Sequence, residues 1–155
     1  MDWISYQDLA ATCQAAIEKL PSIEEEVPAE FAKLDFLTSR GCDNVIADMI
    51  VGYCRNGEWQ DMGCSIIWQL AFRLRFARNY FEAQHGAHPE ARMPGQAAMI
   101  QMAVAATDIW HDGAGAWMAE LTGAEKVLKG QYAASEKDAG QIVQLERLIK
   151  KMGDN

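Results

Sequence analysis

Residues 59–84 read WQDMGCSIIWQLAFRLRFARNYFEAQ and carry apolar side chains on two faces of one predicted helix. One broad apolar face is formed by Trp59, Met62, Ile66, Ile67, Leu70, Leu74, Ala77 and Phe81. A second stripe, Trp68, Phe72 and Phe76, advances in steps of four residues along roughly the opposite side. A helix that is apolar on two faces is either central in a bundle or presents one stripe to a partner. We therefore expect this aromatic stripe to lie either in the core or at an interface.

Three arginines, Arg73, Arg75 and Arg78, interrupt the same helix. An unpaired buried guanidinium is costly, so the arginines favour at least partial exposure of the helix. The next predicted helix, over residues 95–111, is rich in Ala and Met, and we expect it at the centre of the bundle. Asp112-Gly113 is interpreted as the stop of that helix.

Residues that favour helix dominate the rest of the chain: Ala alone occurs 24 times, and no segment shows the period-two alternation of a strand. Apolar spacing and stop residues predict further helices over about 5–20, 28–41, 43–56, 123–133 and 135–152, with a short one near 117–121. Asp43 is expected to cap the helix that follows it. The prediction is an all-α single domain over residues 1–155, an irregular or orthogonal bundle of about six to eight helices.

The chain is acidic, with 14 Lys and Arg against 22 Asp and Glu and a net charge of -8. This balance argues against direct binding to a nucleic-acid backbone or to an anionic membrane. Residues 1–50 hold ten of the acids and only three bases, and Glu24, Glu25, Glu26 and Glu30 lie among them. These four glutamates form either a solvated helix start or an acidic face that binds a basic partner.

The cysteines and the N-terminus predict a cytoplasmic protein. Four cysteines are present without a C-x-x-C pair, and no cationic and apolar signal segment opens the chain. Cys13 lies in the apolar stripe of the first helix, where a small buried side chain is expected. We find no phosphate-binding loop, no Cys partner at zinc-finger spacing and no dinucleotide fingerprint, and expect no cofactor.

Arg78-Asn79 followed by His85, an R-N-x5-H arrangement, resembles the R-x4–6-H motif of HEPN-type ribonucleases, which are small helical proteins. The match covers eight residues. The resemblance implies that Arg78 and His85 help to activate a ribose 2′-hydroxyl and to stabilise the phosphate, without metal and across a dimer interface. The alternative is an exposed Arg and a His at the helix end.

Trp110-His111-Asp112, preceded by His85 or His88 and followed by Asp138, resembles the H…HD…D order of metal-dependent HD phosphohydrolases. That resemblance implies that His88, His111, Asp112 and Asp138 hold a divalent metal that generates a hydroxide nucleophile. The alternative is that Asp112-Gly113 only ends a helix.

Size, acidity and the absence of catalytic motifs favour a protein that acts by binding another protein. An inhibitor or regulator of a nucleic-acid-handling enzyme fits best, similar in kind to bacterial or phage accessory proteins such as anti-CRISPR or immunity proteins. The predicted partner-binding residues are Glu24, Glu25, Glu26, Glu30, Trp68, Phe72 and Phe76, with no catalytic residue and no metal ligand assigned. A homodimer is also compatible with this sequence.

Overall fold

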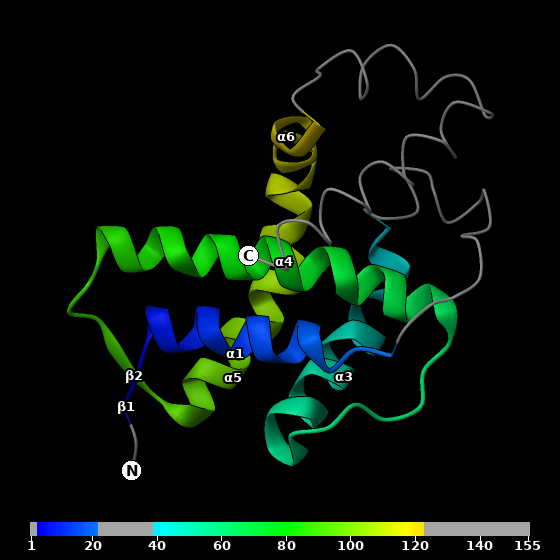
Figure 1. Cartoon of the computed structure of the whole chain (residues 1–155), viewed down its shortest axis with the longest axis horizontal. Coiled ribbons are helices and arrows are strands. Elements are labelled where there is room, and N and C mark those ends of the chain that lie inside the picture. The colour runs from blue at the N-terminus through cyan, green and yellow to red at the C-terminus, as the bar shows by residue number, and fades with distance from the viewer. Residues whose placement is uncertain (1–2, 22–38, 123–155) are drawn as a thin grey trace.

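The computed structural model describes residues 3–21 and 39–122, and Figure 1 shows their arrangement. The elements are β1 (Trp3–Ser5), α1 (Tyr6–Glu18), the 3₁₀ helix η2 (Arg40–Cys42), α3 (Asp43–Asn56), α4 (Cys64–Ala87), β2 (Arg92–Pro94), α5 (Gly95–Val104), the π-helical segment η3 (Ala105–Ile109) and α6 (Trp110–Thr122). The described part is mostly helical, as expected. Most of the helix predicted over 28–41 and both C-terminal helices lie outside these residues, so the predicted helix number is not tested.

Helix α1 begins where the sequence predicts. The Ser5 hydroxyl accepts a hydrogen bond from the Asp8 amide at 3.1 Å, and the Ser5 amide donates to the Asp8 carboxylate at 2.9 Å. This capping box satisfies two amides at the start of the helix. The buried face carries Leu9, Cys13 and Ile17, with Cys13 fully enclosed as expected. That face lies along α4, and the two helices are side by side in Figure 1.

Helix α4 is the buried centre of the described structure. Every residue from 67 to 78 except Ala71 is buried. The prediction that this helix begins at Trp59 is wrong, because Gly63 is its N-cap. Trp59 instead lies before the helix, where its ring stacks on Tyr53 and its indole nitrogen donates to the Ala16 carbonyl at 2.9 Å. The apolar pattern correctly marked Trp59 as a residue that packs against the core. It wrongly placed Trp59 inside the helix.

The expected central position of the helix over 95–111 is wrong. Ile100 of α5 is 51% exposed, so this helix covers one side of the core. The expected stop at Asp112-Gly113 is also wrong, because the chain continues through η3 into α6 and remains helical to Thr122. A Cβ on Gly113 would lie 2.8 Å from Cζ of Phe76. Gly113 is therefore explained by the close approach of an aromatic ring, and it does not end the helix.

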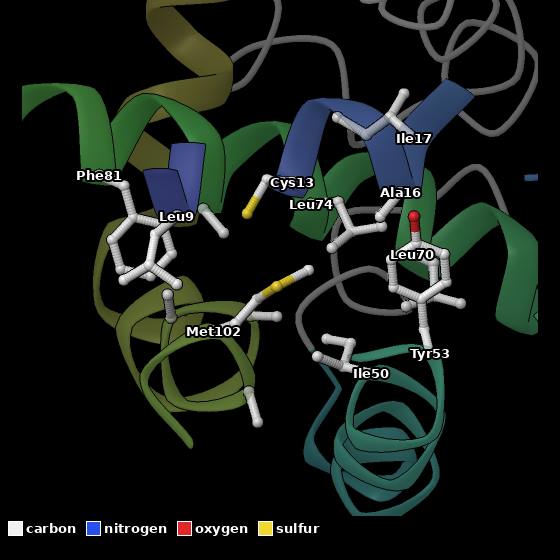
Figure 2. Close-up of a cluster of buried hydrophobic side chains, with 14 of the residues drawn as sticks. Leu9, Cys13, Ala16, Ile17, Ile50, Tyr53, Leu70, Leu74, Phe81 and Met102 are labelled. Carbon is white, nitrogen blue, oxygen red and sulfur yellow. The ribbon is translucent and has the colours of Figure 1, made fainter. Parts of the chain in front are cut away.

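A small antiparallel ladder joins the N-terminus to the segment before α5, with Trp3 opposite Pro94 and Ser5 opposite Arg92. The sequence did not predict it, because three-residue strands are too short to show alternation. Figure 2 shows the main core, in which side chains from α1, α3, α4 and α5 meet. No helix among the described residues is both long enough and apolar enough to cross a membrane.

Candidate functional site

Arg73, at the middle of α4, is a buried polar residue with several hydrogen-bond partners. Its residue is 0% exposed, and each guanidinium nitrogen donates a hydrogen bond. The acceptors are the Asp43 carboxylate at 2.8 Å, the Gln69 side-chain oxygen at 2.9 Å, the Ser39 carbonyl at 3.0 Å and the Ala106 carbonyl at 3.1 Å. The guanidinium carbon also lies 5.8 Å from the ring centre of Trp110. The expected exposure of Arg73 is thus wrong, because the fold supplies the partners that make burial tolerable.

His111 completes this site from α6. Its Nε2 lies 2.9 Å from both carboxylate oxygens of Asp43. An ionised carboxylate only accepts hydrogen bonds, so Nε2 carries the proton in this contact. Asp43 was expected to cap α3, but it is the first residue of that helix and the N-cap is Cys42. Its carboxylate instead joins Arg73 to His111, and we call these three residues the Asp43 triad.

The π-helical segment η3 explains why the triad can form. A π turn widens the helix and leaves a carbonyl without its usual partner in the following turn. Arg73 donates to the carbonyl of Ala106 in this segment, and the hydroxyl of Thr107 donates to the Ala103 carbonyl at 2.9 Å. The same segment places His111, two residues after it, against Asp43.

The environment of the triad holds its carboxylate in the charged form. Burial alone would raise the pKa of Asp43, but the hydrogen bonds from Arg73 and His111 outweigh this and hold that pKa below its usual value. Burial lowers the pKa of Arg73, and the Asp43 carboxylate opposes the shift. Arginine stays protonated in proteins. The triad is therefore an ion pair that links α3, α4 and α6.

The aromatic stripe lies inside the chain. Trp68, Phe72 and Phe76 are 2%, 1% and 8% exposed. Phe76 makes edge contacts with the rings of Trp110 and Trp117, at centroid distances of 5.5 and 5.8 Å. The sequence left open whether this stripe lies in the core or at an interface, and the structure shows that it is buried. A role of these residues in partner binding stays a prediction. The four predicted glutamates, Glu24, Glu25, Glu26 and Glu30, lie outside the described residues.

The two residues of the ribonuclease-like motif share one face of α4, two helical turns apart. Arg78 is buried, however, and its guanidinium donates to the Gln14 side chain at 2.6 Å and to Asn79 at 3.2 Å. The Nδ1 atom of His85 is buried without a hydrogen-bond partner. Arg78 therefore helps to hold α1 against α4, and its expected exposure is wrong. Arg75 is also buried, and it donates to the Ala71 carbonyl at 2.9 Å.

The structure gives the phosphohydrolase-like residues different surroundings. His111 belongs to the Asp43 triad, Asp112 is exposed, and His88 is exposed at the C-cap of α4. Asp138 lies outside the described residues. Over residues 3–21 and 39–122, no group of three or more His, Cys, Asp or Glu side chains is placed to hold a metal ion.

Sequence reasoning missed the Asp43 triad, although one signal for it was present. Arg73 stands between Phe72 and Leu74 in an apolar helix, and Gln69 precedes it by four residues, on the same face. A cation at such a position requires an anion. Asp43 and His111 are 30 and 38 positions away, and only the packing of three helices brings them together.

Comparison with known proteins identifies no relative of this chain. The chain matches no protein-family model, no curated protein and no solved structure.

Proposed function

We propose that this protein acts by binding another protein, through an acidic surface that complements a basic surface on its partner. The observation that carries the proposal is the burial of Arg73, Arg75 and Arg78. These three guanidinium groups count in the net charge but are withdrawn from the surface. Over residues 3–21 and 39–122, the exterior is therefore more acidic than the composition of these residues indicates.

The exposed charges of the described residues bear out this effect. Nine exposed side chains are acidic and four are basic. The acids are Asp8, Glu18, Asp48, Glu58, Asp61, Glu82, Glu90, Asp108 and Asp112, and the bases are Lys19, Arg40, Arg55 and Arg92. Complementary surface charge steers association and selects partners.

One end of the described structure carries two of these exposed acids, beside the exposed bases Lys19 and Arg55, and leads into the glutamates of the sequence prediction. The Lys19 ammonium donates to the Gly57 carbonyl at 3.1 Å, so the end of α1 adjoins the segment after α3. The exposed Glu18 and Glu58 are each next in sequence to one of these two residues. Glu24, Glu25, Glu26 and Glu30 follow α1 along the chain. We propose this end as the partner-binding region, and a nucleic-acid-handling enzyme as the partner, whose phosphate-binding groove would accept the carboxylates.

The test compares two double variants that change the net charge equally. Glu18→Lys with Glu58→Lys alters the proposed end, whereas Glu82→Lys with Glu90→Lys alters exposed positions at and beyond the last turns of α4. Immobilised protein captures its partner from a lysate of source cells, and the affinity of the identified partner is then measured in a salt series. We expect the first pair, and the Glu24/Glu25/Glu26→Lys variant, to weaken binding, with the second pair close to wild type.

Two results would contradict this proposal. An affinity that does not change with salt would exclude an electrostatic interface. Equal effects of the two double variants would exclude the end of α1 as the binding region. Competition with a DNA or RNA oligonucleotide tests the class of partner, because an acidic protein in a phosphate-binding groove must be displaced by nucleic acid.

A further inference from the structure

A pocket of about 420 Å³ lies between β1, α1, α3 and α5. Its size falls in the range of about 300–1,000 Å³ that is typical of small-molecule sites. Apolar side chains form most of its wall, among them Leu9, Ala98, Met99 and Met102. Figure 2 shows Leu9 and Tyr53 on opposite sides of the core cluster, with Met102 between them. Met99 and Met102 both line the pocket, and methionine side chains adapt readily to a flexible chain.

The interior of this pocket carries no charge. Tyr53 and Cys54 are the titratable residues of its wall, and burial raises the pKa of each, so both stay neutral near pH 7. The Cys54 thiol lies 3.7 Å from the Met102 sulfur, which makes this part of the wall soft and weakly polar. An apolar group gains free energy on entering such a space, whereas a charged group would lose its hydration there.

A cation, Lys19, does not line the pocket but contacts two residues of its wall, and we call this place the rim. The Lys19 ammonium donates to the carbonyl of Gly57 and lies 6.0 Å from the ring centre of Tyr53, and both of these residues line the pocket. The Lys19 side chain is exposed. An ammonium group has three donors, and Gly57 accepts from one of them. The rim thus offers charge-assisted hydrogen bonds to an anion whose apolar part occupies the interior.

We propose that this pocket binds a medium-chain carboxylate, with the hydrocarbon chain between α1, α3 and α5 and the carboxylate on Lys19. The apolar interior selects the hydrocarbon chain, and the Lys19 ammonium selects the head group. The rim of this pocket adjoins Glu18 and Glu58 of the proposed protein-binding region, but the binding of a carboxylate does not depend on that proposal.

Calorimetric titration of the full chain with hexanoate, octanoate and decanoate tests the proposal. We expect the Kd to fall about fourfold for each added methylene until the pocket is full, which corresponds to about 0.8 kcal/mol per buried CH₂. Octanoate should bind more tightly than octanol, and Lys19→Gln should remove this preference while octanol binding is unchanged. A Kd independent of chain length, or no binding, would overturn the proposal. Equal affinities for octanoate and octanol in the wild type would overturn the carboxylate assignment.

A matched pair of variants locates the site. Met99→Trp places a large ring in the wall, at a partly exposed position that tolerates it, whereas Ile100→Trp changes the next, exposed residue, which is not part of the wall. The first should abolish octanoate binding and the second should not, with melting curves to show that both fold. Octanoate should also slow alkylation of Cys54 by N-ethylmaleimide, read by peptide mass spectrometry, but not that of Cys42. Binding that survives Met99→Trp, or unprotected Cys54, would contradict this location.

Discussion

At the scale of single residues, the structure depends on polar groups that are enclosed only because other groups satisfy them. Arg73 is the clearest case, since a guanidinium without partners could not remain in the middle of a buried helix. Gly113 is the apolar counterpart, because it leaves room for the ring of Phe76. A substitution tests the role of each residue, and a control substitution at another position of the same helix accompanies it.

Asp43→Asn should lower the free energy of unfolding by about 3 kcal/mol, near the lower end of the effect of breaking a buried ion pair, because the Asp43 side chain is 19% exposed. The variant leaves the Arg73 charge buried without its carboxylate. Urea unfolding at pH 7 measures the change. Asp48→Asn, at an exposed position on α3, is the control and should stay within about 0.5 kcal/mol of wild type. Equal effects of the two substitutions would contradict the structural role of the triad.

Gly113→Ala should destabilise the protein by about 1–3 kcal/mol, because the new methyl group overlaps the ring of Phe76. That ring cannot move away easily, since it is packed against Trp110 and Trp117. Gly115→Ala, on the same helix with nothing within 4 Å, should stabilise by up to about 1 kcal/mol through helix propensity. Thermal unfolding of both variants should shift in opposite directions. A shift in the same direction would show that Phe76 can yield.

At the scale of elements, α4 separates two apolar layers. On one side, Leu70, Leu74 and Phe81 face the core shared with α1, α3 and α5 (Figure 2). On another, the aromatic stripe packs within itself and against α6. The sequence pattern identified both apolar faces, but it did not determine whether the second face packs against this chain or against a partner.

Phe72→Glu tests whether the aromatic stripe is essential to the fold. Phe72 is 1% exposed, and an unpaired carboxylate at that position should remove most of a stability that is typically about 5–15 kcal/mol. We expect loss of cooperative unfolding and of much of the helical circular dichroism. Ala83→Glu, at an exposed position of α4, is the control and should unfold like wild type. A folded Phe72→Glu variant would restore the interface interpretation of this stripe.

At the scale of the whole molecule, the stability of the fold depends on pH, because carboxyl groups have lower pKa values in the folded state than in the unfolded chain. The folded-state pKa of Asp43 lies below its value in the unfolded chain, so its contribution to stability is present above about pH 4 and is lost as the pH falls through the folded-state pKa. Asp8 has a lowered pKa as well, through its hydrogen bonds with Ser5. Acid should therefore loosen both the start of α1 and the junction of three helices.

The free energy of unfolding should fall more steeply between about pH 5 and about pH 3 in the wild type than in Asp43→Asn, which has no carboxylate to protonate at this position. Urea unfolding at several pH values in this interval gives the two slopes. The difference between the slopes is the readout, because it is independent of the lower overall stability of the variant. Parallel slopes would show that Asp43 has the same pKa in the folded and unfolded states.

Local sequence determined the parts of this protein that depend on neighbours within a few residues. The capping box of Ser5 and Asp8, the apolar face around Cys13 and the end of α3 at Gly57 each involve contacts within one or two helical turns. Such contacts leave a direct pattern in the chain. The predicted start of the first helix near Ser5, the burial of Cys13 and the end of the helix over 43–56 are confirmed, whereas the capping box with Asp8 was not predicted. The acidity of residues 1–50 is likewise a property of the sequence, although its role stays a prediction.

Only the tertiary structure decided the features that depend on contacts between residues far apart in the sequence. The burial of Arg73 depends on Asp43, 30 positions away, and the passage of the helix through Gly113 depends on a ring of α4. A guanidinium in an apolar helix indicates either exposure or a distant carboxylate, and a glycine after Asp112 indicates either a helix stop or a close contact. The sequence is compatible with both alternatives at each position, and the packing of the helices selects one. The reason is that the free-energy cost of a buried charge or of a void in the core depends on the groups that surround it.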